Sequence, residues 1–544
     1  MVRCFFIFLR DMKRLFFLLV TMLGTCGVFA QSMNDAFDKF KQQQNSKFNQ
    51  FKSDKQAEFD AFRKRVNDQY AAFMEQSWEQ MQSKPAVTPK KEPEVKPVVY
   101  QEPTPAPVPA PQPTPKPAPQ PQPTPKPTPA PTPQPKPIPT PSPAPTPAPQ
   151  PQVLPIQQEI VEVPKPTPAP EPIAPVQPKE DPYKAVSVSF YGTTVSVGFP
   201  EPDNFKLAGL NEKQLANAWK QLATDKYDIT IANALEARKN LKLCDWGYLQ
   251  MLQAITKKHY GNTNEAVFMQ VFLMTQSGYR VRMANGNGKL YMLISSQYSI
   301  CDMPYYTIDN QKFYAIDFAG GSLQICKAAY DKEKSLSLQI AQTQNLTQQA
   351  TQKRTLTSKK GVTAGVCVNK NLIDFYNNYP SGYLNNDVTT RWAAYANTPL
   401  EQSVKDMLYP TLKKTIQNMT QKDAVGIILN WVQTAFEYEY DDKVWGGDRA
   451  FFATETLYYP YCDCEDRSIL FSRLVRDLVG LPVVLLYYPG HLATAVAFQD
   501  EVRGDYVLIR DKKYTICDPT YIGANVGMTM PGMNNQKAKA IVLK

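Results

Sequence analysis

The fold is decided by residues 461–482, which read YCDCEDRSILFSRLVRDLVGLP. After the polar opening, apolar side chains recur at the spacing of one helix face, at Ile469, Leu470, Leu474, Val475 and Leu478. This spacing predicts a helix that begins at Cys464 and ends at the Gly480-Leu481-Pro482 turn. The N-terminus of a helix presents unpaired N–H groups and the positive end of the helix dipole. Both stabilise a thiolate and the oxyanion formed by its attack, so Cys464 is the predicted nucleophile.

Two predicted strands follow this helix, with a histidine between them. Residues 483–488 read as a buried strand, and Pro489-Gly490-His491 leads into a second strand over 492–498. The chain has only two histidines, and imidazole is the usual base for a cysteine nucleophile near neutral pH. A third predicted strand ends at Asp518, whose carboxylate can hold the imidazole in the right tautomer. Cys464, His491 and Asp518 are therefore the predicted catalytic triad.

Each member of this triad also has a structural interpretation. Cys462 and Cys464 could form a disulfide or a metal pair, but no histidine cluster accompanies this Cys-x-Cys, so no metal and no cofactor are expected. Cys462 is the alternative nucleophile, although only Cys464 stands at the start of the predicted helix. The alternatives for the other two residues are a core role for His491 and a turn-capping role for Asp518.

Taken together, the motifs from about Leu400 to Pro531 resemble the transglutaminase-like domain of the papain-like cysteine enzymes. The matching features, in order, are Cys464-Glu465-Asp466, Ser468, Arg476, Gly480-Leu481-Pro482, His491 and Asp518-Pro519-Thr520. Each feature is weak alone, but all occur in the family's order with suitable spacing. The wider layout is similar to exported transglutaminase-like proteins of Bacteroidota.

The resemblance implies an α+β fold with a papain/transglutaminase-like core, in which the cysteine helix packs on an antiparallel sheet. It implies a thiol enzyme, a cysteine peptidase, amidase or acyltransferase, that attacks peptide or amide carbonyls in a protein or peptide substrate. The thioacyl intermediate would pass to water or to an amine. No calcium loop is recognisable in the sequence, which argues against an animal-type crosslinking enzyme. The alternative function is a non-catalytic envelope scaffold that uses the same fold to bind proteins.

Composition narrows the class of protein. The net charge of the 544 residues is +10, but the lysines are spread along the chain without a basic, aromatic-rich stripe, so nucleic-acid binding is not expected. Of the nine cysteines, Cys4 and Cys26 fall in a predicted signal peptide. The remaining seven, an odd number, suit one nucleophile and up to three disulfides. The six other cysteines could equally be free thiols, and they are Cys244, Cys301, Cys326, Cys367, Cys462 and Cys517.

Residues 1–30 are the predicted signal peptide. A basic region precedes a short apolar run at residues 15–23, and Val28-Phe29-Ala30 is a small-residue cleavage pattern. Together with the resemblance, this predicts export to the periplasm or cell envelope of a Gram-negative bacterium. A lipoprotein anchored at Cys26 is the alternative, which Thr25 fits badly.

Residues 31–83 are predicted to form a long amphipathic helix. Aromatic pairs recur every 11 residues along it, from Phe37 and Phe40 to Tyr70 and Phe73. Eleven residues make three turns of about 3.67 residues, so one helix would carry a single aromatic stripe over residues 37–73. Such a stripe needs a partner, and self-association, an envelope partner, the protein's own domain and a lipid surface are the alternatives.

Residues 84–182 are so rich in proline that they are predicted to be a disordered, solvated spacer of polyproline II type. The globular part is expected to comprise an accessory α+β domain over 183–360 and the transglutaminase-like catalytic domain over 361–544.

The accessory domain is hypothesised to hold a degenerate copy of the catalytic fold. Laying Gly278 on Gly480 without gaps puts Asn262 at the position of Cys464 and Lys289 at that of His491. The sequence 300–302, Ile-Cys-Asp, echoes 516–518 at a different offset.

Overall fold

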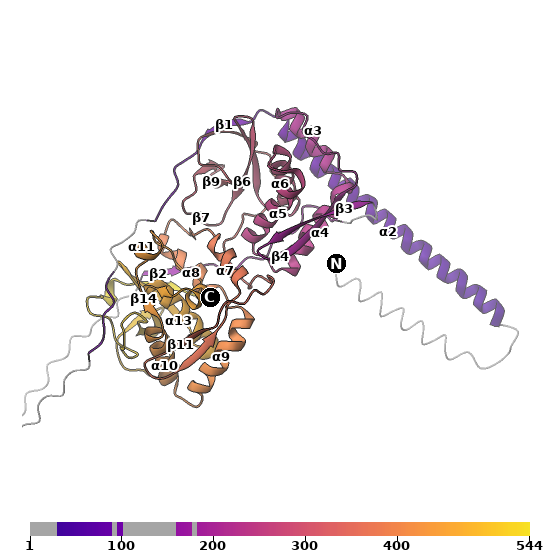
Figure 1. Cartoon of the computed structure of the whole chain (residues 1–544). Helices are drawn as coiled ribbons and strands as arrows, with labels where there is room; N and C mark the ends of the chain where they lie inside the picture. Colours follow the sequence, from indigo (N-terminus) through magenta and orange to yellow (C-terminus); the bar gives the residue numbers. More distant parts are fainter. Residues whose placement is uncertain (1–29, 90–94, 102–158, 177–181) are drawn as a thin grey trace, which may run out of the picture.

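The computed structural model describes residues 30–89, 95–101, 159–176 and 182–544, and it shows a mixed α+β protein (Figure 1). The predicted signal peptide, apart from its last residue, and residues 102–158 of the Pro-rich tract lie outside this description. Within the described residues, no helix is long and apolar enough to cross a membrane.

The N-terminal globular part contains a six-stranded sheet with the order β1-β10-β5-β6-β9-β8. Its strands are β1 (Glu79–Gln82), β5 (Val281–Gly286), β6 (Lys289–Ser295), β8 (Tyr305–Ile308), β9 (Gln311–Ala315) and β10 (Ser322–Ile325). Helix α6 packs on β5 and β6, and α5 packs on α6. The helices are α3 (Glu212–Leu222), α4 (Asp228–Asn240), α5 (Asp245–Tyr260) and α6 (Asn264–Gln276), beside a hairpin of β3 (Tyr183–Phe190) and β4 (Thr193–Pro200).

The C-terminal part contains a second six-stranded sheet, with the order β18-β19-β17-β16-β20-β2. Its strands are β2 (Glu159–Glu162), β16 (Val483–Tyr488), β17 (His491–Val496), β18 (Tyr506–Ile509), β19 (Lys512–Cys517) and β20 (Lys539–Val542). The helices are α7 (Lys370–Asn377), α8 (Arg391–Asn397), α9 (Gln402–Ile416), α10 (Gln421–Thr434), α11 (Asp441–Val444), α12 (Ala453–Tyr458) and α13 (Cys464–Leu478). Strands β16 and β17 are nearly continuous apolar runs because α13 covers one face of them and a second apolar cluster covers the other.

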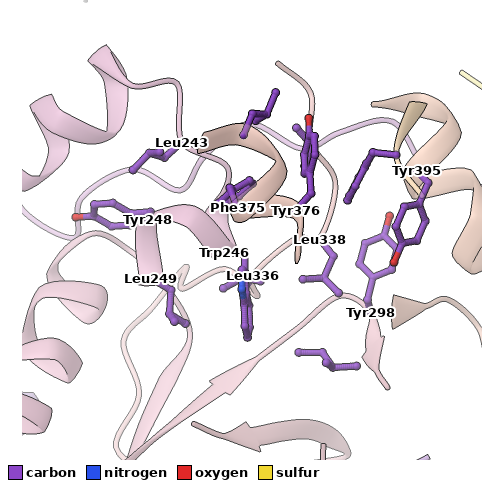
Figure 2. Packing of buried hydrophobic residues seen from close by; sticks show 14 of the residues in the cluster. Leu243, Trp246, Tyr248, Leu249, Tyr298, Leu336, Leu338, Phe375, Tyr376 and Tyr395 are labelled. Carbon is purple, nitrogen blue, oxygen red and sulfur yellow. The ribbon is translucent and has the colours of Figure 1, made fainter. Parts of the chain in front are cut away.

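One hydrophobic core joins the two parts. In Figure 2, side chains from α5 and the strand region near Tyr298 lie beside those of α7 and α8, including Tyr376 and Tyr395. The predicted boundary at 360/361 falls in the turn of a hairpin formed by β11 (Arg354–Thr357) and β12 (Thr363–Val366). The accessory domain and the C-terminal part therefore pack as one body.

A long helix, α2 (Ala30–Met74), docks its C-terminal turns onto the N-terminal part. Tyr70 is buried and stacks on Tyr330, with ring centroids 4.4 Å apart. The side-chain oxygen of Asn67 accepts hydrogen bonds from the side chains of Trp219, Gln276 and Tyr330, at 3.0, 2.8 and 2.7 Å. The protein's own domain is thus one partner of the aromatic stripe, while Phe40, Phe48 and Phe51 stay exposed.

The two ends of the Pro-rich tract are fastened to the globular parts. Strand β1 and Lys84 pair with the N-terminal part, through β10 and Tyr305. Residues 95–101 lie on the C-terminal part, where the backbones of Val98 and Tyr100 bond to that of Ile522. Strand β2 then pairs in parallel with β20. The prediction of a solvated spacer over 84–182 is wrong at Lys84, at 95–101 and at β2, whose backbones pair with the globular parts. The helix predicted over 31–83 ends at Met74, and β1 lies in place of its last residues because their backbone pairs with β10.

The Asn67 cluster predicts how firmly α2 is held. Asn67→Leu would leave three buried donors without an acceptor, each costing about 1–3 kcal/mol, so we expect a loss of about 3 kcal/mol or more. Urea unfolding of the full chain, followed by circular dichroism, measures this loss. Phe51→Ala, on the exposed part of the same helix, is the control, and equal stabilities of the two variants would contradict the docking.

Candidate active site

Cys464 is the first residue of α13, as the sequence predicts. Asp463 caps the helix by accepting from the backbone N–H of Asp466, and the Asp466 carboxylate accepts in return from the backbone N–H of Asp463. The other carboxylate oxygen of Asp466 accepts from the backbone N–H of Phe451 at 2.8 Å. This capping box fixes the first turn of α13 and with it the position of the thiol.

Hydrogen bonds to Leu492 join this first turn to the strand that carries the histidine. The backbone N–H of Leu492 donates to the Cys464 thiol, and the Ser468 hydroxyl donates to the Leu492 carbonyl at 2.8 Å. His491, the residue before Leu492, opens β17 and faces Tyr488 across the β16–β17 turn. The structure therefore brings Cys464 beside the backbone of the strand that begins with His491.

His491 and Asp518 form a direct pair. The Nε2 of His491 lies 2.9 Å from an Asp518 carboxylate oxygen, and both side chains are almost fully buried. The other oxygen of Asp518 accepts from the backbone N–H groups of Thr520 and Tyr521, at 2.8 and 3.3 Å. Asp518 thus both caps the turn and orients the imidazole. Among the described residues, the buried Nδ1 of His491 has no hydrogen-bond partner, so it is available as a proton acceptor.

Two further residues, Gln433 and Arg467, hold the site together, and no sequence pattern predicts them. The buried Gln433 of α10 donates to the carbonyls of Asp518, Tyr521 and Ala524, at 2.8 to 3.2 Å. The buried Arg467 donates to the carbonyl of Gln433 at 3.1 Å. Their contacts join segments far apart in the chain, which no local pattern reports.

Cys462 has a structural place of its own. Its sulfur accepts from Arg467 Nε at 3.4 Å and donates to the carbonyl of Glu437 at 3.6 Å. It is not bonded to Cys464, and all seven cysteines in the described residues are free thiols. Of the two arrangements left open by the sequence, the structure has the one without disulfides.

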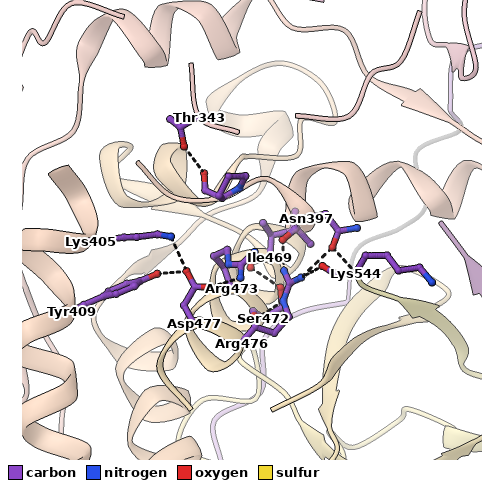
Figure 3. Close-up of polar contacts among 12 residues, drawn as sticks. Thr343, Asn397, Lys405, Tyr409, Ile469, Ser472, Arg473, Arg476, Asp477 and Lys544 are labelled. Carbon is purple, nitrogen blue, oxygen red and sulfur yellow. Dashed lines mark hydrogen bonds and ion pairs between the residues drawn. The ribbon is translucent and has the colours of Figure 1, made fainter. Parts of the chain in front are cut away.

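The far end of α13 is anchored by Arg476 (Figure 3). Its guanidinium donates to the side-chain oxygen of Asn397 and the backbone carbonyl of Lys544, at 3.1 and 3.0 Å. The neighbouring Asp477 accepts from the hydroxyl of Tyr409 at 2.6 Å. These bonds tie the helix to α8, to α9 and to the chain's C-terminus.

Burial, followed by two neighbouring carboxylates, sets the pKa of the Cys464 thiol. Glu465 lies 3.1 Å from the Cys464 sulfur and is itself buried. Burial raises the pKa of Cys464 well above its ordinary value, and the charges of Glu465 and Asp463 raise it further. The expected stabilisation of the thiolate at the helix start is therefore outweighed, and the thiol is protonated at neutral pH.

Asp463 and Glu465 also lie in groups of carboxylates that are close enough together to hold a metal ion. In one group, single ligand atoms of Asp441, Asp463 and Asp466 lie within 4.8 Å of one another, and Asp448 and Glu465 form a second group with Asp441. Burial and the neighbouring carboxylates raise the pKa values of Asp463 and Asp466 well above their usual range.

Gln433 is expected to act as a positioning residue for the His491–Asp518 pair. Gln433→Leu would release the loop after Asp518, and we expect alkylation of Cys464 by iodoacetamide to slow by about tenfold or more, because small displacements cost large factors in such geometries. The control is Gln421→Leu at the start of the same helix, where the half-buried side chain bonds Gln499. Equal rates for both variants in mass-spectrometric labelling would exclude this role.

The carboxylate of Glu465 gives a prediction with a definite sign. A negative charge next to a thiol disfavours the thiolate, so Glu465→Gln is expected to lower the pKa of Cys464. The inflection in the pH profile of Cys464 alkylation would then move to lower pH. An unchanged or higher inflection would contradict the assignment.

The predicted triad residues thus lie in one buried cluster, in which His491 bonds Asp518 directly and Cys464 bonds the residue after His491. In comparisons with known proteins, no family model, no curated protein and no solved structure matches this chain.

Proposed function

We propose that this chain is an exported thiol enzyme of transglutaminase-like type that acts on peptide or amide bonds in proteins or peptides. The observation that carries the proposal is the His491–Asp518 pair, in which Nδ1 of the imidazole has no partner among the described residues, while the next residue, Leu492, bonds the Cys464 thiol. A histidine oriented by a carboxylate and adjacent to a helix-start cysteine is the arrangement that nucleophilic acyl transfer requires.

The proposed reaction begins with transfer of the Cys464 thiol proton to Nδ1 of His491. The sulfur bonds to the carbonyl carbon, and the resulting oxyanion is stabilised by N–H groups at the start of α13. Asp518 stabilises the imidazolium through Nε2. The carbon–nitrogen bond then breaks, and the leaving amine takes the proton from the imidazolium. Water or a second amine attacks the thioester, returns the thiol and releases an acid or a new amide.

The fold proposed for this centre is the papain/transglutaminase-like core. Its support is the antiparallel run β20-β16-β17-β19-β18 with α13 packed on β16 and β17. The cysteine opens the helix, the histidine opens β17 and the aspartate follows β19, in the order that the motifs predict.

The alternative function is a non-catalytic envelope scaffold, with binding through the exposed aromatic rings of α2. Phe40, Phe48 and Phe51 are 49, 65 and 60% exposed, which supports a role of the stripe in self-association or in binding an envelope partner. The scaffold function and the enzyme function differ in whether Cys464 reacts in a histidine-dependent way.

The test is alkylation of the full chain with iodoacetamide, with the rate at Cys464 measured by mass spectrometry. His491→Ala is expected to slow alkylation by about 10²-fold, since a positioned general base contributes about that factor, and Asp518→Asn is expected to slow it as well. His259→Ala, the only other histidine, is the control and should leave the rate unchanged. If His491→Ala and His259→Ala label at the same rate, the enzyme proposal fails.

The two outcomes of the thioester are separated with a glutamine-containing protein and a fluorescent primary amine. Incorporation of the amine would assign acyl transfer, whereas release of ammonia or of a peptide without incorporation would assign hydrolysis. Either product must disappear in Cys464→Ala.

A further inference from the structure

The two six-stranded sheets have the same topology. Reading from the edge strands β1 and β2, the first sheet is β1-β10-β5-β6-β9-β8 and the second is β2-β20-β16-β17-β19-β18. Neighbouring strands are antiparallel throughout both sheets, with one exception. The edge strand β1 is antiparallel to β10, whereas the edge strand β2 is parallel to β20. In each sheet a helix immediately precedes the central hairpin and packs on it, α6 in the first and α13 in the second. We infer that residues 205–330 are a second copy of the catalytic fold in which the catalytic residues are replaced. The corresponding site, called the vacated site below, binds a carboxylate-bearing peptide and does not react with it.

The central hairpins match residue by residue. Gly286 faces Lys289 as Tyr488 faces His491, and Val281 faces Ile294 as Val483 faces Val496. Both turns end in a glycine of positive φ, Gly288 at 74° and Gly490 at 73°. Lys289 therefore opens β6 at the position where His491 opens β17, as the sequence hypothesis proposed.

The helix starts match through their contacts and correct part of that hypothesis. Asn264 is the first residue of α6, and its side-chain oxygen accepts from the backbone N–H of Leu290 at 2.9 Å. Leu290 corresponds to Leu492, whose N–H donates to the Cys464 thiol in the other copy. The residue in place of the nucleophile is therefore Asn264 and not Asn262, because α6 is shorter at its N-terminus than α13.

The third position is also corrected by strand pairing. Ile294 pairs with Tyr314 in the first sheet as Val496 pairs with Thr515 in the second. Three residues after the paired Tyr314 comes Asp317, as Asp518 comes three residues after Thr515. Asp317, and not the Asp of the 300–302 echo, therefore occupies the position of the triad carboxylate.

These three replacements remove the chemistry and leave a polar site. A carboxamide at Asn264 cannot form a thioester, and an ammonium at Lys289 has no lone pair to accept a proton. Asp317 is 65% exposed and pairs with Lys257 at 3.1 Å and with Gln253 at 2.6 Å. In the described part of the chain, the Lys289 ammonium makes no ion pair.

A cavity of about 250 Å³ lies at this vacated site. Asn264, Lys289 and Asp317 all line it, together with Lys257 and Tyr291. The lining has two lysines and one carboxylate. Lys257 pairs with that carboxylate, Asp317, so the ammonium of Lys289 is the positive charge available to a ligand. An anionic group on a peptide fits this lining, and the peptide class rests on the function proposed for Cys464 because the two copies share one architecture.

The geometry of the copy is tested by restoring the triad in a Cys464→Ala background. Asn264→Cys with Lys289→His is compared with Asn264→Cys with Lys289→Gln, and circular dichroism checks that both fold. We expect iodoacetamide to label position 264 at least tenfold faster in the histidine variant. Equal rates would overturn the duplicated site. The background lacks Cys464, so this result does not depend on the proposed activity.

The ligand is tested by fluorescence anisotropy of labelled Gly-Gly-Glu-Gly-Gly and Gly-Gly-Gln-Gly-Gly on the Cys464→Ala full chain. The glutamate peptide is expected to bind more tightly, and Lys289→Glu is expected to weaken it at least fivefold. Lys239→Glu, an exposed lysine of α4 outside the cavity, is the matched control. Equal binding in the two charge-reversal variants, or no preference for glutamate, would overturn the ligand assignment.

Discussion

The hydrogen bonds to Leu492 are the constraint on which the site depends. They hold the first turn of α13 against the beginning of β17, from one side through the Ser468 hydroxyl and from the other through the Cys464 thiol. The start of the helix and the start of the strand are thereby held together, so that Cys464 lies against the residue that follows His491. The remaining supports, the Asp463–Asp466 capping box and the Gln433 bonds to the loop after Asp518, hold the two flanks of this junction.

Local patterns in the sequence predicted the secondary structure around the candidate site. The start of α13 at Cys464 and the positions of His491 and Asp518 at strand ends follow from periodicity and turn residues, whereas the α+β class was implied by the resemblance of the motifs to a known family. The supporting roles of Gln433 and Arg467 were not predicted, because their hydrogen-bond partners lie far away in the chain. A buried glutamine also has no periodic sequence pattern. The effect of Glu465 on the thiol was also missed, since the balance between a helix dipole and nearby buried carboxylates depends on burial that sequence does not report.

The two copies also explain where the C-terminal part differs. In the first, Gly261, Asn262 and Thr263 alone separate α5 from α6, whereas β14 (Glu437–Tyr438), α11, α12 and β15 (Tyr461–Cys462) lie between α10 and α13. This added segment supplies Asp441 and Asp448, which lie beside the carboxylates of Asp463, Glu465 and Asp466 at the start of α13. Relative to the hairpin that follows, α6 begins later than α13. The gapless alignment could not show this difference, and it therefore placed Asn262 and not Asn264 at the position of Cys464.

The fastening of both ends of the Pro-rich tract changes what a break in the chain would mean. The residues on one side of 102–158 are held by β1 and by the contacts of 95–101, and those on the other side begin with β2 in the second sheet. A single proteolytic cut between Gln101 and Glu159 would therefore give two fragments that stay bound to each other. The two products would separate on a denaturing gel and still elute together in native buffer, so cleavage of this tract would not release the C-terminal part.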